Sequence, residues 1–287
     1  MSATVGGRPR VIAGLRRLGP AGVTGVVGLV VIIIACAVGR FLLPVPRIDL
    51  EAIITGPSWV HPLGTDYTGR DNLHLLLRGG WDMLQLAAVA GLVTAGIAVT
   101  LGMLGAFLGG TVDKVIVLAI DAWLTAPRFV LLLVIASLVR VQNMLALAVL
   151  IAVFAWPYLA RQIRAQALSL RRREYVEAAR LLQLRTPHII VRYLVPAIAP
   201  FVVISTIQAM TSAIYQQVGL AFFGLVPLDD NWGSLFSVAY QQNALYYADA
   251  AWSLLMPVAA ICLLQFCLVL TSQALESRFD PRLRGDA

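Results

Sequence analysis

The run MLQLAAVAGLVTAGIAVTLGMLGAFLG, residues 83–109, decides the class of fold. It carries no charged residue, and a helix needs about 20 mainly apolar residues to cross the hydrocarbon core of a membrane. Small residues recur along it in steps of three and four, at Ala87, Gly91, Ala95, Ala98, Gly102, Gly105 and Gly109. Because such a stripe lets helix backbones approach closely in lipid, we expect a spanning helix packed against other helices of the same subunit.

Five more apolar runs extend the same pattern along the chain. The sequence therefore predicts about six transmembrane helices, at residues 22–43, 83–109, 115–139, 144–159, 194–222 and 252–273. The 287 residues are 59% hydrophobic and 13% charged, whereas soluble chains carry about 25% charged residues. The expected fold is an all-α polytopic membrane protein, without enough remaining chain for a soluble enzyme domain.

The arginines predict how the chain is oriented. They gather in the N-terminal segment, between residues 161 and 192, and in the C-terminal tail. The loop between the last two runs carries Asp229, Asp230 and Asp249 and no basic residue. Since positive residues favour the cytoplasmic side, both termini and the 161–192 loop are expected there.

With six spans, the expected organisation has five parts. They are a cytoplasmic N-terminal segment (1–20), a first transmembrane helix (21–43), an external loop (44–82), a core of five transmembrane helices that includes the cytoplasmic loop (83–274), and a cytoplasmic tail (275–287).

The cytoplasmic stretch RRREYVEAARLLQLRTPHIIVRYLVP, residues 171–196, reads as two short helices. The first covers about residues 172–182 and places Tyr175, Val176, Ala179 and Leu182 on one face. The second begins at Thr186, with Pro187 at the first helical position. An exposed amphipathic helix either lies on the membrane surface or docks into a groove on a partner protein. Its residue pattern alone favours neither use.

Within this stretch, Glu177-Ala178-Ala179 and Leu194-Val195-Pro196 at the matching spacing resemble the EAA loop of ABC importer permeases. In that family the loop forms coupling helices that fit into a cleft of the ATPase subunit. Gln183 stands at the family's glycine position, where glycine makes a left-handed turn without steric cost and glutamine makes it at some cost. The resemblance assigns ATPase coupling to Tyr175, Glu177, Ala178, Ala179, Gln183 and Pro196.

Other motifs resemble the dipeptide, oligopeptide and nickel-type permeases in particular. They are HPLGTD at 61–66 with GRD at 69–71, FFGL at 222–225 with WG at 232–233, and FDPR at 279–282. Residues 271–277, TSQALES, depart from the family pattern. In the first motif the glycines suit tight turns, and the charged residues either lock the loop or contact a delivered binding protein. The external-loop candidates are Gly64, Asp66, Arg70 and Asp71.

The resemblance implies a permease subunit of an ATP-driven importer in the bacterial or archaeal inner membrane. Its expected partners are a homologous second permease, two ATPase subunits and an external substrate-binding protein, with no nucleic acid. The substrates of such permeases include dipeptides, longer peptides, nickel chelates and oligosaccharides, and the sequence does not choose among them.

The sequence lacks the residues that ATP binding or catalysis would need. It has no GxxxxGK[ST] phosphate loop, and Lys114 is its only lysine. No catalytic or metal-ligand spacing is visible, so we expect no enzyme activity and no cofactor, with ATP used by partner subunits. Two rival hypotheses are a stand-alone secondary transporter, which usually has an internal repeat, and a membrane-embedded enzyme.

Polar residues within the expected spans are candidates for the translocation path, because charge inside a membrane is costly and often functional. Asp121 and Arg128 are seven positions apart in the 115–139 run, which places them on one helical face. They either line the path or make a polar contact that orders the bundle. A second stripe faces either a water-filled cavity or neighbouring helices: Ser205, Gln208, Ser212 and Tyr215.

Overall fold

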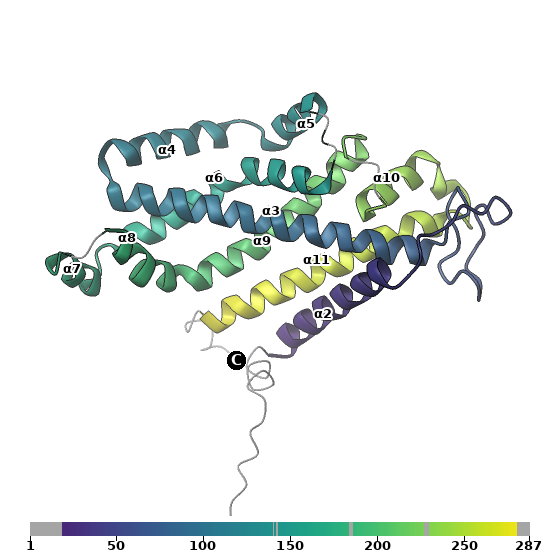
Figure 1. Cartoon of the computed structure of the whole chain (residues 1–287), viewed down its shortest axis with the longest axis horizontal. Coiled ribbons are helices and arrows are strands. Elements are labelled where there is room, and N and C mark those ends of the chain that lie inside the picture. The colour runs from purple at the N-terminus through teal and green to yellow at the C-terminus, as the bar shows by residue number, and fades with distance from the viewer. Residues whose placement is uncertain (1–18, 140, 142, 184–185, 227–229, 280–287) are drawn as a thin grey trace, which may run out of the picture.

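The computed structural model describes residues 19–139, 141, 143–183, 186–226 and 230–279. Within these residues the fold is all-α (Figure 1). Long helices lie side by side and make up most of the molecule: α2 (Gly19–Phe41), α3 (Asn72–Leu108), α6 (Met144–Leu170), α9 (Val195–Phe222) and α11 (Ala251–Phe279). With the turn before α9, these five helices are long and apolar enough to cross a membrane. Five of the six expected spans are therefore confirmed.

The remaining expected span, 115–139, is not one continuous helix. It is divided into α4 (Gly110–Thr125) and α5 (Arg128–Val139), which are bent by 86° relative to each other. The residue before a proline is pushed out of the helical region, and Ala126, which precedes Pro127, has an extended backbone at φ −84° and ψ 143°. The prediction that Asp121 and Arg128 share one helical face is therefore wrong.

Two of the spanning helices each extend eleven residues beyond one of their expected limits. α3 begins at Asn72, inside the segment 44–82 that the sequence assigns to a loop, because Asp71 caps its first turn by accepting a hydrogen bond from the His74 backbone N–H. α6 continues past residue 159 to Leu170. Its added turns carry Arg161 and Arg164, which form ion pairs with aspartates of α4.

The small-residue stripe of α3 lies buried inside the subunit, as expected. Ala98 of α3 and Ala160 of α6 are fully buried. A Cβ atom added to Gly102 would lie 2.9 Å from the carbonyl oxygen of Ala160. The two helices can pack this closely only because no larger side chain separates their backbones.

The two ends of the bundle carry different structures (Figure 1). At one end are α7 (Glu174–Leu181) and α8 (Thr186–Ile189), followed by a π-helical turn, η1 (Ile190–Leu194), which continues into α9. At the opposite end are the loop formed by residues 42–71, α10 (Trp232–Gln241) and the short 3₁₀ turn η2 (Ala244–Tyr246). We call the loop of residues 42–71 the long loop.

Candidate functional site

A polar cavity of about 280 Å³ lies between α3, α5, α6 and α9. Its wall includes four of the six residues predicted to line a path: Arg128, Ser205, Gln208 and Ser212. Thr94 of α3 and two residues of α6 add further polar groups, Tyr158 and Gln162. No acidic residue lies among the described residues that line this cavity.

The break in the third span brings Arg128 to this cavity. Arg128 is the first residue of α5, directly after the bend. Its Nη2 donates a hydrogen bond to Ser212 Oγ of α9 at 3.0 Å. Gln216, one turn further along α9, donates from Nε2 to the Ser212 carbonyl oxygen at 3.0 Å. The bond from Arg128 to Ser212 therefore joins α5 to α9 across the cavity wall.

The other two predicted path residues lie elsewhere. Asp121 forms an exposed ion pair with Arg161 of α6. Tyr215 is 60% exposed and does not line the cavity, whose wall on α9 covers only residues 205–212. Sequence reasoning missed a second ion pair between α4 and α6, in which Arg164 Nε donates to Asp113 Oδ1 at 2.6 Å. The opposite charges of Asp113 and Arg164 were the available signal, although their 51-residue separation concealed the contact.

At the end of the bundle that carries α7, α8 and η1, one face of α7 packs against the rest of the subunit. Val176 is fully buried and Ala179 is 4% exposed, and both belong to an apolar cluster with Ile189 and Leu194. Leu181 and Leu182 are 81% and 74% exposed. Leu182, expected on one helical face with Val176 and Ala179, lies just after the helix ends and therefore does not follow its periodicity. The side chains of three predicted coupling residues lie outside the described part of the chain: Tyr175, Glu177 and Ala178.

Gln183 makes the left-handed turn that the family glycine would make, with φ +55°. This conformation costs a non-glycine residue roughly 1–2 kcal/mol. The substitution therefore keeps the geometry of the loop and adds local strain. Pro196 lies in the first turn of α9, directly after the π-helical turn, where the Val195 N–H bonds to the Ile190 carbonyl.

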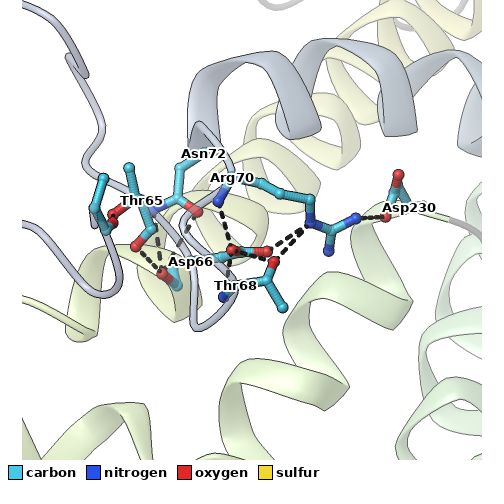
Figure 2. A network of polar contacts seen from close by, with 8 residues as sticks. Thr65, Asp66, Thr68, Arg70, Asn72 and Asp230 are labelled. Atoms are coloured by element: carbon cyan, nitrogen blue, oxygen red, sulfur yellow. Dashed lines mark hydrogen bonds and ion pairs between the residues drawn. The ribbon is translucent and has the colours of Figure 1, made fainter. Parts of the chain in front are cut away.

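In the long loop, Asp66 organises a tight network of hydrogen bonds (Figure 2). The side chain is buried, and its Oδ1 accepts from the backbone N–H of Thr68 at 2.8 Å and of Arg70 at 2.9 Å. The Thr68 hydroxyl also donates to Oδ1 at 2.7 Å. Gly64 and Gly69 adopt φ values of +69° and +77°, so both glycines make the turns that the sequence predicts.

Arg70 connects this network to a distant part of the chain. Its Nε donates to Asp66 Oδ2 at 3.0 Å, and its Nη1 donates to Asp230 Oδ1 at 2.8 Å, next to the start of α10 (Figure 2). Burial by itself lowers the pKa of Arg70, but the charges and hydrogen bonds of Asp66 and Asp230 outweigh it, so the pKa is raised. This geometry matches the loop-locking interpretation. Sequence reasoning missed Asp230 as a partner because it lies 160 positions away.

Asp71 fixes the junction between the long loop and α3. Its Oδ1 caps α3, and its Oδ2 lies 2.8 Å from His61 Nδ1. The next residue, Asn72, is fully buried, and its Nδ2 donates to the Leu63 carbonyl at 2.9 Å and to Ser253 Oγ of α11 at 3.1 Å. The HPLGTD and GRD motifs therefore hold the long loop against two spanning helices.

Long apolar helices packed around a cavity with polar side chains in its wall define a polytopic membrane protein. Residues 98–285 match the family described as binding-protein-dependent transport system inner membrane component. This match covers more than half of the chain, so the chain belongs to that family. It is a multi-pass protein of the inner membrane, and the resemblance indicated by its motifs is confirmed.

Relatives with assigned names are similar over most of their length. The oligopeptide transport system permease protein OppC of Mycobacterium tuberculosis (strain H37Rv) is 30% identical, with 83% of this chain and 81% of the relative covered. A putative peptide permease protein of Brucella suis is 33% identical, with coverage of 82% and 78%. OppC of Escherichia coli K12 is 32% identical, with coverage of 78% and 73%.

Proposed function

We propose that this chain is a permease subunit of an ATP-driven importer that carries peptides or a related small solute. It pairs with a homologous permease, two ATPase subunits and an external binding protein. The observation that carries the proposal is α7, which is packed on one face and ends in the exposed Leu181, followed directly by the exposed Leu182. The names of the relatives, which are peptide and oligopeptide permeases, support the substrate class.

The attachment of α7 suits a docking element. A helix buried along Val176 and Ala179 keeps a fixed position, while the exposed Leu181 and Leu182 offer apolar surface to a groove on a partner. The arginines between residues 161 and 192 support a cytoplasmic location for this end, where an ATPase subunit operates. The long loop then lies on the external side, where a binding protein delivers solute.

The chain also connects α7 to the polar cavity. α8, η1 and α9 follow α7 with only a short break, and the same α9 carries Ser205 and Ser212 in the cavity wall. A shift of α7 therefore moves a helix that lines the cavity, and this contiguous element supplies a physical route for coupling. ATP is bound and hydrolysed by the partner subunits.

Charge reversal at Glu177 tests the proposal. In proteoliposomes that contain the complete complex, Glu177→Arg should abolish solute uptake while the subunit still inserts and ATP hydrolysis continues without transport. The matched control is Glu51→Arg in the long loop, which leaves the α7 end unchanged. Uptake by Glu177→Arg at the full rate contradicts the assignment of coupling to α7.

The energy source separates this proposal from a stand-alone secondary transporter. Uptake should require ATP inside the vesicles and should persist after ionophores collapse the ion gradients. Uptake that follows an ion gradient and ignores ATP supports the secondary transporter instead. Family membership favours the importer.

A further inference from the structure

Among the described residues, the guanidinium of Arg128 has one hydrogen-bond partner, the hydroxyl of Ser212. It contacts Ser212 Oγ at 3.0 Å in the cavity between α3, α5, α6 and α9. It forms no ion pair with any residue that the structure describes. A single neutral hydrogen bond does not compensate a positive charge withdrawn from water.

Two arginines of α6 in the same bundle are neutralised by aspartates of α4. Arg164 pairs with Asp113 at 2.6 Å, and Arg161 pairs with Asp121. The helices thus supply carboxylates to two arginines and none to Arg128. An uncompensated charge at membrane depth is costly, and such charges mark substrate and ion pathways.

The remaining cavity wall also favours an anion. Hydroxyl and amide groups that can donate hydrogen bonds surround Arg128, and the described lining holds no acidic group that would repel a negative charge. Arg128 is also the first residue of α5, so the positive end of that helix dipole lies at the same place. A guanidinium binds a carboxylate through two parallel hydrogen bonds. The cavity is therefore suited to a carboxylate.

We propose that Arg128 and Ser212 form a subsite that binds a carboxylate of the transported solute during its passage. The proposal rests on the import function proposed above and specifies one recognised group. The cavity of about 280 Å³ lies just below the usual range for ligand pockets, about 300–1,000 Å³. It therefore holds the carboxylate end of a solute, and the rest of the molecule extends beyond it.

Cysteine labelling measures this charge without any need for transport. The reporter is Ala209→Cys, whose side chain lines the cavity. It is introduced together with Cys262→Ser, because Cys262 is the exposed native cysteine and Cys36 and Cys267 are buried. The reagents are an anionic sulfonatoethyl and a cationic trimethylammonium-ethyl methanethiosulfonate. They are applied to the assembled complex with and without ATP.

The ratio of the two labelling rates is the readout. With Arg128 in place, the anionic reagent should be favoured, and Arg128→Gln should lower the anionic-to-cationic ratio by about tenfold. Arg128→Lys retains the charge and should retain most of the ratio. Ser58→Cys, in the exposed long loop, should show no change with Arg128→Gln. If Arg128→Gln leaves the anionic-to-cationic ratio at Ala209→Cys unchanged, a carboxylate of a partner already neutralises the arginine. This result overturns the proposal.

Protection by a small peptide identifies the bound group. At a concentration near twice its dissociation constant, tri-alanine should slow labelling of Ala209→Cys about threefold. Tri-alanine amide, in which the C-terminal carboxylate is replaced by a neutral amide, should not slow this labelling. Tri-alanine itself should not slow labelling of Ala209→Cys in the Arg128→Gln variant. Equal protection by both peptides, absence of protection, or absence of labelling in every nucleotide state overturns the subsite. None of these readouts depends on uptake, so a failure of the import function appears separately, in the vesicle assay.

Discussion

Arg70 and Arg128 are both half-buried, yet their surroundings differ in kind. Arg70 bonds to Asp66 in its own loop and to Asp230, which lies 160 positions further along the chain, and thereby fastens the long loop to the start of α10. Arg128 contacts Ser212 in a cavity without acidic lining among the described residues. Arg70, paired with two carboxylates, maintains the structure of the long loop, whereas Arg128, which lines a cavity and has no carboxylate partner among the described residues, remains available to a ligand.

Removal of Asp66 should produce the largest loss of stability. Asp66→Ala deletes a buried acceptor of four hydrogen bonds and leaves part of the Arg70 charge uncompensated. We expect a loss of about 3 kcal/mol, because breaking a buried ion pair leaves an unpaired charge. The thermal unfolding of the detergent-solubilised complex measures it. Asp249→Asn, an exposed change at the same end of the bundle, is the matched control, and an equal effect at both sites would show that the Asp66 network does not lock the loop.

The same substitution at the two arginines tests their difference directly. Arg70→Gln should destabilise the complex by about 2 kcal/mol, because Asp66 and Asp230 lose a charged donor. Arg128→Gln should change the stability by less than about 1 kcal/mol, because no ion pair is broken and an unpaired charge is removed. Unfolding midpoints in detergent provide the measurement. A larger loss for Arg128→Gln than for Arg70→Gln would reverse the assignment of the two roles.

Relief of strain at Gln183 should have the smallest effect. Glycine removes the steric cost of φ +55° but adds conformational freedom to the unfolded chain. We therefore expect Gln183→Gly to stabilise the α7 end by no more than about 1 kcal/mol. Amide hydrogen exchange across residues 174–183 measures the change. Gln183→Val, which is β-branched, should instead accelerate exchange, and slower exchange in the valine variant would show that the turn is not strained.

The sequence predicted the spanning helices well because an apolar run of sufficient length has few alternatives in a membrane. It also predicted that the stripe on α3 packs inside the subunit. The break between α4 and α5 was missed, although Pro127 gave a signal, because the apolar character of the run continues on both sides of it. The start of α3 at Asn72 was missed for a different reason, since charged residues near its beginning concealed the helix.

The candidate site was predicted in part. Ser205, Gln208 and Ser212 have a helical spacing, and the structure brings them together with Arg128. That spacing cannot show where a cavity ends along a helix, so Tyr215 was included. The bond from Arg70 to Asp230 depends on how distant segments pack, and no local pattern reports it.

Photo-crosslinking from Leu182 tests most directly whether α7 docks on an ATPase partner. Benzoylphenylalanine replaces Leu182, and the complete complex is irradiated in membranes with and without ATP. The account predicts an adduct with the ATPase subunit whose yield changes with ATP, while the same probe at the exposed Val31 of α2 gives no such adduct. A Leu182 probe that labels lipid and never the ATPase subunit would show that α7 lies on the membrane surface, and it would contradict the account.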